Sequence, residues 1–461
     1  MNLKTVSTEG SWELSDYPLW HGAAPMSLTT EFGGPAKVLV AGEGCWVEDA
    51  AGRRYLDARA GICNVNLGYG RSDVVKAMYE QASALPFACS IRYERLAKVT
   101  LEYARALVDA APEGLTRVRL THMGSASVEG ALLMTRLFFK NDARANKRWI
   151  IALEGSFHGT TLMSMAASGE KQLHEIFGPM PEGFTHVAAP FPRETDRAMT
   201  IDENCDLALD LLRERIEALG QENVAGIILE PVMGTRVNPL PARYLQEVRR
   251  ICDDNDILLI FDEIVTAFGR VGFFFAADHF GVTPDIMCLA KGITSGYATL
   301  GAVLVNERVF AGFDGEGRIH FPNGSSTDGH PIACAGAQAV LSAYKDEGVI
   351  DAGRRIGEMI MALLKKSLQD HPLVADIRGL GMYIGIEIRN PDGSLPNLAT
   401  MRGIESECER RGVLIHYSSN LVILMPPLIM TKEEAETVVE SISETLQELS
   451  LDAMSPRPPF S

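Results

Sequence analysis

Three charged side chains in the middle of the chain stand where catalytic groups are often placed. Two apolar runs, 257–261 and 286–290, are short, rich in branched residues and continuous, which predicts strands buried on both faces. The first run leads into Asp262 and Glu263, and the second leads into Lys291. Because ligands bind at the carboxyl ends of strands in open α/β sheets, we expect a carboxylate and an amine to face one crevice, from strands that could be neighbours. Considered singly, each of these charged residues is better explained as a strand-end side chain that faces water.

The residues after Lys291 favour a reactive amine. Gly292, Ser295, Gly296 and Gly301 leave little bulk around it. An amine among small and apolar neighbours loses its charge more easily and can act as a Schiff-base nucleophile. A carboxylate facing that amine suits a cofactor with a protonated ring nitrogen. Pyridoxal phosphate (PLP) needs both groups.

The segments FDEIVTAFGRVG and DIMCLAKGITSGY resemble the class III aminotransferases, which have PLP fold type I. The TSGY sequence after the lysine is similar to their omega-amino acid/amine transaminase branch. The resemblance implies an α/β fold with a large doubly wound, mostly parallel-sheet PLP domain and a smaller α+β domain formed by both termini. Strands alternating with helices agree with this. We expect an N-terminal arm and part of the small domain over 1–64, the large domain over 65–330, and the rest of the small domain over 331–461.

The resemblance assigns roles to the central residues. Lys291 would form the aldimine with PLP and then serve as the general base. Asp262 would pair with the ring nitrogen and keep it protonated. Val265, three residues further on, would pack on one face of the ring, and Phe157 would stack on the other. A core phenylalanine with a capping His158 is the more ordinary alternative for that segment.

A further strand, 116–121, runs into Gly124, Ser125 and Ala126 at the start of a helix expected over 128–140. Unpaired N–H groups at a helix amino end bind anions, and the family places the cofactor phosphate at such a segment. Strand 224–229 ends in Glu230, within an EPVMG sequence that matches the family. We count Glu230 and His158 among the cofactor-binding residues.

The segment HFPNGSSTDGHP resembles the family's T-x-S-G-H-P segment, which reaches the phosphate of the neighbouring subunit's cofactor. The matching hydroxyl is Ser326, or Thr327 because Asp328 departs from the pattern. A structural turn is the alternative. The resemblance therefore implies at least a homodimer, with a tetramer as the alternative, and an active site at the subunit interface.

The predicted substrate pocket lacks the arginines that family members use for carboxylates. His416 stands at the mobile-arginine position and Ile423 near the fixed one. A histidine there is more often a solvated loop residue, although within the pocket it could pair with Glu230. Arg236 is as plausible a substrate contact as a surface residue. The remaining pocket residues predicted are Ile62, Cys63, Trp20 and Phe87; the first two replace larger side chains, so we hypothesise that bulky amines are accepted.

Composition excludes several classes of partner. The 461 residues carry a net charge of −17, which argues against nucleic acid and anionic membranes. No apolar run approaches the roughly 20 residues that span a bilayer, and no signal peptide is recognisable. The eight cysteines are scattered, without metal-ligand spacing, so we expect reduced thiols, no metal and a cytoplasmic protein.

The function predicted is transfer of an amino group from an amine or omega-amino acid to a carbonyl acceptor such as pyruvate, another keto acid or an aldehyde, by a ping-pong mechanism. A PLP-dependent mutase, racemase or decarboxylase is the alternative within the same fold. A nucleotide-binding oxidoreductase is disfavoured because the first strand-turn-helix lacks GxGxxG. A non-catalytic member would be expected to lose Lys291 or Asp262, and both are present.

Overall fold

The computed structural model of the chain describes residues 19–22, 38–91, 95–191 and 199–454. The arm and short helix that we expect over residues 1–35 lie almost wholly outside these ranges. Within them, none of the helices combines the length and the hydropathy needed to cross a membrane.

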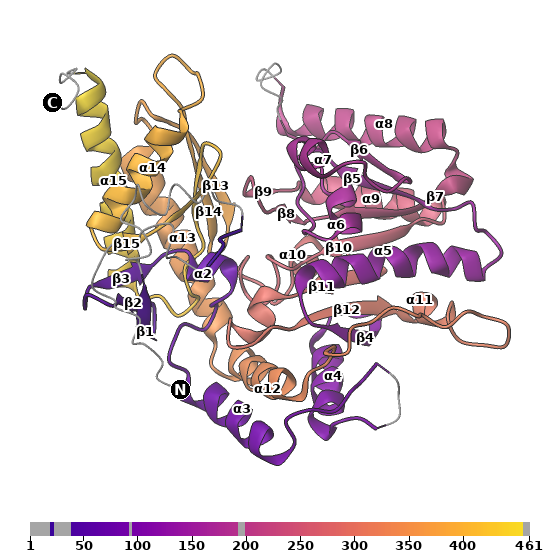
Figure 1. The fold of residues 1–461 in the computed structure, drawn as a ribbon. Coiled ribbons are helices and arrows are strands. Elements are labelled where there is room, and N and C mark those ends of the chain that lie inside the picture. Colours follow the sequence, from indigo (N-terminus) through magenta and orange to yellow (C-terminus); the bar gives the residue numbers. More distant parts are fainter. Residues whose placement is uncertain (1–18, 23–37, 92–94, 192–198, 455–461) are drawn as a thin grey trace.

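A seven-stranded sheet forms the centre of the larger part of the molecule (Figure 1). Its strands, in order across the sheet, are β4 (Leu115–Thr121), β12 (Gly301–Asn306), β11 (Ile286–Leu289), β10 (Leu258–Asp262), β7 (Val224–Leu229), β5 (Trp149–Leu153) and β6 (Phe184–Val187). Only β12 runs antiparallel to its neighbours in this sheet. The mostly parallel sheet predicted from the sequence is confirmed, and β10 and β11 are indeed neighbours.

Helices cover both faces of this sheet. Leu258 and Ile260 of β10 pack in one hydrophobic cluster with helix α5 (Gly124–Asn141). The intervening Leu259 and Phe261 pack in a second cluster with α8 (Ile201–Leu219) and α9 (Ala242–Asp254). Successive side chains of a strand point to opposite faces, so a strand covered on both sides is apolar throughout. That explains the continuous hydrophobic runs in the sequence.

Shorter elements complete this part of the chain. They are α3 (Ser72–Ala84), α4 (Lys98–Ala110), α6 (Leu162–Ala167), α7 (Lys171–Phe177), η3 (Gln221–Asn223), the hairpin β8 (Val232–Met233) and β9 (Asn238–Pro239), α10 (Ala276–Phe280), η4 (Lys291–Thr294), α11 (Glu307–Ala311) and α12 (Pro331–Asp346). Helix α12 packs against α3 and α4, along the lower edge of the view in Figure 1.

Strands from both ends of the chain build the smaller part. One sheet has the order β1 (Leu39–Glu43), β2 (Trp46–Asp49), β3 (Arg54–Asp57) and β15 (Val413–Leu414), and a second has the order β13 (Val374–Leu380), β14 (Tyr383–Ile388), β17 (Leu421–Leu424) and β16 (His416–Ser418). Strand β15 pairs parallel to β3, with Val413 opposite Leu56. Helices α13 (Val349–Leu368), α14 (Leu398–Arg410) and α15 (Lys432–Met454) flank these sheets (Figure 1). The predicted fold class is confirmed, and the division at residues 64 and 330 remains our proposal.

Candidate active site

A cavity of about 920 Å³ lies where the carboxyl ends of the large sheet face the smaller part of the molecule. Its wall is formed by residues 61–65, 122–125, 157–159, 264–265, 290–291 and 296–300, together with Glu230, Gly234, Thr235, Asp262, Thr294, Tyr383, His416, Ser418, Ile423 and Met425. Both Asp262 and Lys291 therefore face one crevice, as the two strand ends suggested.

Asp262 is a buried carboxylate held from two sides. It ends β10 and keeps 4% of its surface exposed. Nδ1 of His158 lies 2.9 Å from its Oδ2, and the backbone N–H of Ile264 donates to its Oδ1 at 3.1 Å. These contacts fix the plane of the carboxylate, because each oxygen has its own partner. A buried carboxylate at this position is suited to a cationic ligand group.

The adjacent Glu263 points away and has a different task. Its carboxylate accepts the N–H groups of Ala276 at 2.7 Å and Ala277 at 2.8 Å, at the start of α10, and the Thr266 hydroxyl at 3.0 Å. Burial raises the pKa of Glu263 to about 7, with those hydrogen bonds opposing the rise. Of the two acids that follow the strand, one faces the cavity and the other stabilises a helix.

Lys291 occupies a strained backbone position. It begins the short η4 turn directly after β11, with φ of +46°. Non-glycine residues in the left-handed region cost roughly 1–3 kcal/mol and occur preferentially at functional sites. The Tyr344 hydroxyl donates to the carbonyl of Gly292 at 2.8 Å, and the N–H of Leu67 donates to Ser295 Oγ at 2.9 Å. The turn that presents the amine is therefore held by contacts from distant parts of the chain.

The amino end of α5 lies close beside this turn. The first helical hydrogen bond of this region runs from the N–H of Ser127 to the carbonyl of Met123 at 3.1 Å, so the N–H groups of 124–126 precede it. A Cβ on Gly124 would approach Ala290, the residue before Lys291, to 3.3 Å. Gly124 and Ser125 line the cavity, whereas the side chain of Ala126 does not. The arrangement suits a phosphate next to the amine.

Phe157, Val265 and Glu230 also line the cavity. Phe157 and Val265 are half-buried, as side chains that sandwich a planar ring need to be. Glu230 accepts the N–H of Phe157 at 2.9 Å, so it holds the loop that carries the aromatic ring.

Ser326 and Thr327 lie outside this cavity on an exposed turn. The neighbouring Asp328 is buried, and its hydrogen bonds hold the turn in place. Its carboxylate accepts the guanidinium of Arg119 at 2.9 Å and the N–H of Ser325 at 3.0 Å, and lies 3.1 Å from Nδ1 of His122. Both hydroxyls are thus on exposed residues of a turn that Asp328 holds, and their contact to another subunit stays a prediction.

Three predicted pocket residues do not line the cavity of this chain. Trp20 is 86% exposed, and Phe87, which is 44% exposed, lies 5.7 Å from the ring of His330. Arg236 is exposed and packs over Gly155, where a Cβ would lie 2.6 Å from its Nε. Arg236 therefore lies outside the cavity wall of this chain, and its role as a substrate contact stays a prediction.

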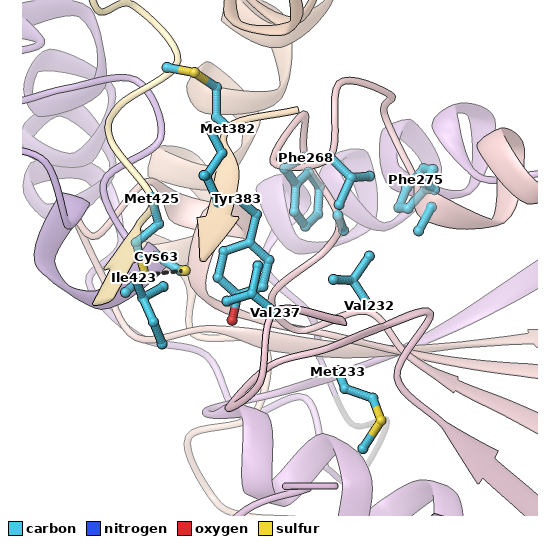
Figure 2. Packing of buried hydrophobic residues seen from close by; sticks show 14 of the residues in the cluster. Cys63, Val232, Met233, Val237, Phe268, Phe275, Met382, Tyr383, Ile423 and Met425 are labelled. Carbon is cyan, nitrogen blue, oxygen red and sulfur yellow. Dashed lines mark hydrogen bonds between the residues drawn. The ribbon is translucent and has the colours of Figure 1, made fainter. Parts of the chain in front are cut away.

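The other predicted pocket residues are present. His416 lines the cavity, and its pKa is lowered by burial and by the charge of Arg59. No ion pair joins it to Glu230 within the described part of the chain, so that suggested pairing is absent here. Ile62 is 51% exposed at the cavity wall, whereas Cys63 is buried with its Sγ 2.7 Å from Sδ of Met425 (Figure 2).

The segment that carries Ile62 and Cys63 is a left-handed turn. All four residues of α2 (Ala60–Cys63) have positive φ, between 44° and 61°. Asp57 accepts the N–H of Gly61 at 3.0 Å, and the Asn64 amide donates to the carbonyls of Gly61 at 2.7 Å and Ile62 at 2.9 Å. No sequence pattern signals such a turn, because only one of its four residues is glycine.

Sequence reasoning missed several contributors to the wall, among them Tyr383, Met425 and His122. Tyr383 donates its hydroxyl to the carbonyl of Gly234 and lies beside Ile423 and Met425 in Figure 2. His122 lines the cavity just before the anion-binding segment. Only His122 carried a signal, since it directly precedes Met123 and Gly124 at the end of β4; the others depend on tertiary packing.

Comparison with known proteins agrees with this geometry. The family model for class-III aminotransferases matches residues 34–446. An omega-aminotransferase of Caulobacter vibrioides is 34% identical over 92% of this chain and 96% of its own length. A putrescine–pyruvate aminotransferase of Pseudomonas aeruginosa is 31% identical over 88% of this chain and 89% of its own. An amine transaminase from an uncultivated Pseudomonas species, solved in the PLP-bound form, is 29% identical, with a TM-score of 0.89 over 95% of this chain and all of that one.

The chain belongs to the class III aminotransferase family. It is an aminotransferase of PLP fold type I, similar to omega-transaminases, and the family acts on small-molecule amine and keto substrates. The family implies pyridoxal phosphate as the cofactor, and the buried acid, the lysine turn and the helix amino end fit that group.

Proposed function

We propose that this aminotransferase uses pyridoxal phosphate held by Lys291 to move an amino group from an amine or omega-amino acid to pyruvate or a similar carbonyl acceptor, in a ping-pong reaction. The observation that carries the proposal is the meeting of Lys291 and Asp262 in one buried cavity, from adjacent parallel strands. The pyruvate acceptor is supported by the similarity to the putrescine–pyruvate enzyme.

When bound, pyridoxal phosphate supplies an aldehyde for an amine and a ring that accepts electrons. Lys291 Nζ would take a proton from the substrate carbon that bears the amino group and would deliver it to the former aldehyde carbon of the cofactor instead, so that the amino group changes carriers. Asp262, oriented by His158 and the N–H of Ile264, would hold a positive charge at the ring nitrogen. Phe157 and Val265 would keep the ring flat between them. The N–H groups of 124–126, with Ser125 Oγ, would bind the phosphate.

The assembly and setting are part of the proposal. We propose a homodimer or a tetramer in which Ser326 or Thr327 reaches the cofactor phosphate of the other subunit. The exposed turn clamped by Asp328 supports this arrangement. We propose the cytoplasm as the compartment, since the eight cysteines are free thiols. Neither nucleic acid nor a membrane is proposed as a partner, given the net charge of −17.

The test is the absorption spectrum of the purified protein with pyridoxal phosphate, before and after adding amines and then pyruvate. We expect a visible band that amines bleach and pyruvate restores. Lys291→Ala should lose the visible band, and its turnover should fall by about 10²- to 10⁴-fold or more. Lys366→Ala, on an exposed part of α13, is the matched control. A band that no amine bleaches would contradict transamination, and turnover without a carbonyl acceptor would indicate a racemase, mutase or decarboxylase instead.

A further inference from the structure

The left-handed turn of α2 carries side chains of the cavity wall on a backbone that non-glycine residues avoid. Ala60, Ile62 and Cys63 have φ of 44°, 61° and 60°. Ile62 lines the cavity and is 51% exposed, and Cys63 lines it from a buried position. A strained backbone persists only where its surroundings hold it, so the contacts to this turn determine where both side chains lie.

Asp57 holds the turn from its N-terminal side. It ends β3, is 2% exposed, and is not itself part of the cavity wall. Its Oδ1 accepts the N–H of Arg59 at 3.1 Å, and its Oδ2 accepts the N–H of Gly61 at 3.0 Å and the hydroxyl of Tyr69 at 2.6 Å. Nε of Arg59 lies 3.6 Å from Oδ1. One buried carboxylate therefore binds two backbone N–H groups at the start of the turn.

The next residue, Ala58, fixes two further segments of the wall. Its N–H donates to the carbonyl of Leu414 at 3.0 Å, and its carbonyl accepts the N–H of Met425 at 2.9 Å. Strands β3 and β15 pair in parallel here, with Asp57 opposite Leu414. Met425 lines the cavity, as does His416, two residues after Leu414. Residues 57–58 therefore join three parts of the wall, of which the turn lies far from the other two in the sequence.

We propose that Asp57 is a positioning residue for substrate selectivity: its carboxylate, with the Tyr69 hydroxyl, fixes the turn that places Ile62 at the cavity wall. This inference rests on the proposed transaminase function. While the turn is fixed, Ile62 is a stationary boundary for the group that the amine carries. Without the carboxylate, the strained residues relax towards ordinary φ values, so Ile62 yields to a large group and Cys63 loses its packing on Met425.

Asp49 provides a matched control within the same sheet. Its Oδ1 accepts the N–H groups of Ala51 and Arg53, each at 2.9 Å, and its Oδ2 accepts the Tyr55 hydroxyl at 2.8 Å. Like Asp57, it therefore binds two backbone N–H groups and one tyrosine hydroxyl. Asp49 holds the hairpin between β2 and β3, all of whose residues lie outside the cavity wall. A loss that is only structural should appear in both variants, whereas a change in selectivity should appear only at Asp57.

The first measurement is the ratio of kcat/KM for α-ethylbenzylamine to that for sec-butylamine, which carries a methyl group in place of the phenyl ring. Asp57→Asn keeps the size of the side chain, but its amide cannot accept from every donor that the carboxylate binds. With pyruvate as acceptor, we expect this variant to raise the ratio about 10-fold and Tyr69→Phe to raise it about 3-fold, the range of one net hydrogen bond. Asp49→Asn should leave it unchanged. If Asp57→Asn does not fold, Tyr69→Phe decides.

A second substitution tests whether the effect acts through the turn. Ile62→Trp should lower the same ratio roughly 10-fold in the wild type and in Asp49→Asn, but about 3-fold or less in Asp57→Asn, where residue 62 is no longer fixed. An equal effect of Ile62→Trp in all three backgrounds, or no effect in any of them, would overturn the inference.

Thiol labelling gives a readout that does not depend on turnover. Cys63 is a free thiol that is 3% exposed, and Cys252 and Cys408 are free thiols buried elsewhere. With iodoacetamide and peptide mapping, Asp57→Asn should label Cys63 about 10-fold faster than the wild type and leave the other two thiols unchanged, since only the turn opens. If Cys63 stays protected, or if the amine ratio matches that of Asp49→Asn, the inference is overturned while transamination stands. If the wild type reacts with no amine, the proposed function itself fails.

Discussion

The two halves of the cavity are built in different ways. The half proposed to hold the cofactor consists of Gly124, Phe157, Asp262, Val265 and Lys291. Each follows a strand of the large sheet within a few residues. Because the carboxyl ends of parallel strands meet at one edge, these side chains converge as a consequence of the sheet alone. Hydrogen bonds from the backbone and from His158 then fix the acid within that half.

The half proposed to receive substrate consists of Ile62, Tyr383, His416, Ile423 and Met425. These residues come from the left-handed turn near the N-terminus and from strands and a loop near the C-terminus. They meet only through tertiary packing; Figure 2 shows this for Tyr383, Ile423 and Met425. The position of the first group of side chains therefore depends on the large sheet, whereas the position of the second group depends on packing between distant parts of the chain. The predictions below test that division.

Among the variants below, the largest effect should come from comparing the two neighbouring acids at the end of β10, Asp262 and Glu263. Asp262→Asn removes the charge that would pair with a cationic ring nitrogen, and we expect transaminase turnover to fall about 10²- to 10³-fold, as for a broken buried ion pair. Glu263→Gln is the control, since Glu263 binds α10 and does not face the cavity. Turnover and the visible spectrum are measured for both. Equal losses in the two variants would mean that the acids act through stability rather than at the cofactor.

A smaller effect, on cofactor affinity, is expected from changing the turn that is proposed to contact the cofactor of the other subunit. Asp328→Asn leaves Arg119 in a partly buried position without its carboxylate, so the turn carrying Ser326 and Thr327 should loosen. We expect apo-protein to bind pyridoxal phosphate about 10-fold more weakly, the lower part of the range for hydrogen bonds to charged groups. Fluorescence titration measures the dissociation constant. Asp314→Asn, exposed in the preceding loop, serves as control.

Two further variants sharpen that result. Ser326→Ala and Thr327→Val, titrated separately, show which hydroxyl reaches the phosphate. If both leave cofactor affinity unchanged while size-exclusion chromatography shows a dimer, the contact across subunits is not made.

The same division decides how much could be read from the sequence. The strands ending in Asp262 and Lys291 were predicted within a residue or two, since continuous apolar runs and abrupt charges are local signals. Their neighbour relation followed from the fold. That Asp262 and not Glu263 faces the cavity was expected only from the family pattern. The alternation of a strand places the two on opposite sides, but it does not say which side is which.

The residues of the half proposed to receive substrate were harder to predict from the sequence. For Arg236 the sequence leaves a substrate contact and a surface position equally open; the structure places it exposed, beside the tight turn around Val237 at φ of +46°. Tyr383 lies in a strand whose pattern indicates only burial. Positive φ values at Ile62 and Cys63 have no sequence signal, because neither residue favours that region. Tertiary contacts, not propensity, fix this wall.

The smallest effect, and the most specific, concerns bulk at Ile62. The hypothesis of a roomy pocket rests on Ile62 and Cys63, but Cys63 is 3% exposed and packed on Met425, so a tryptophan there would overpack the core. Ile62 projects at the wall and is the better probe. Ile62→Trp should reduce kcat/KM for bulky aryl amines roughly 10-fold, equivalent to about 1.4 kcal/mol, and change that for small amines little. Ile62→Gly, which also relieves the left-handed backbone, should keep or raise the bulky-amine rate. If the enzyme turns over small amino acids alone, and Ile62→Trp has no effect on any amine, the side chain does not limit substrate size and the cavity is bounded elsewhere.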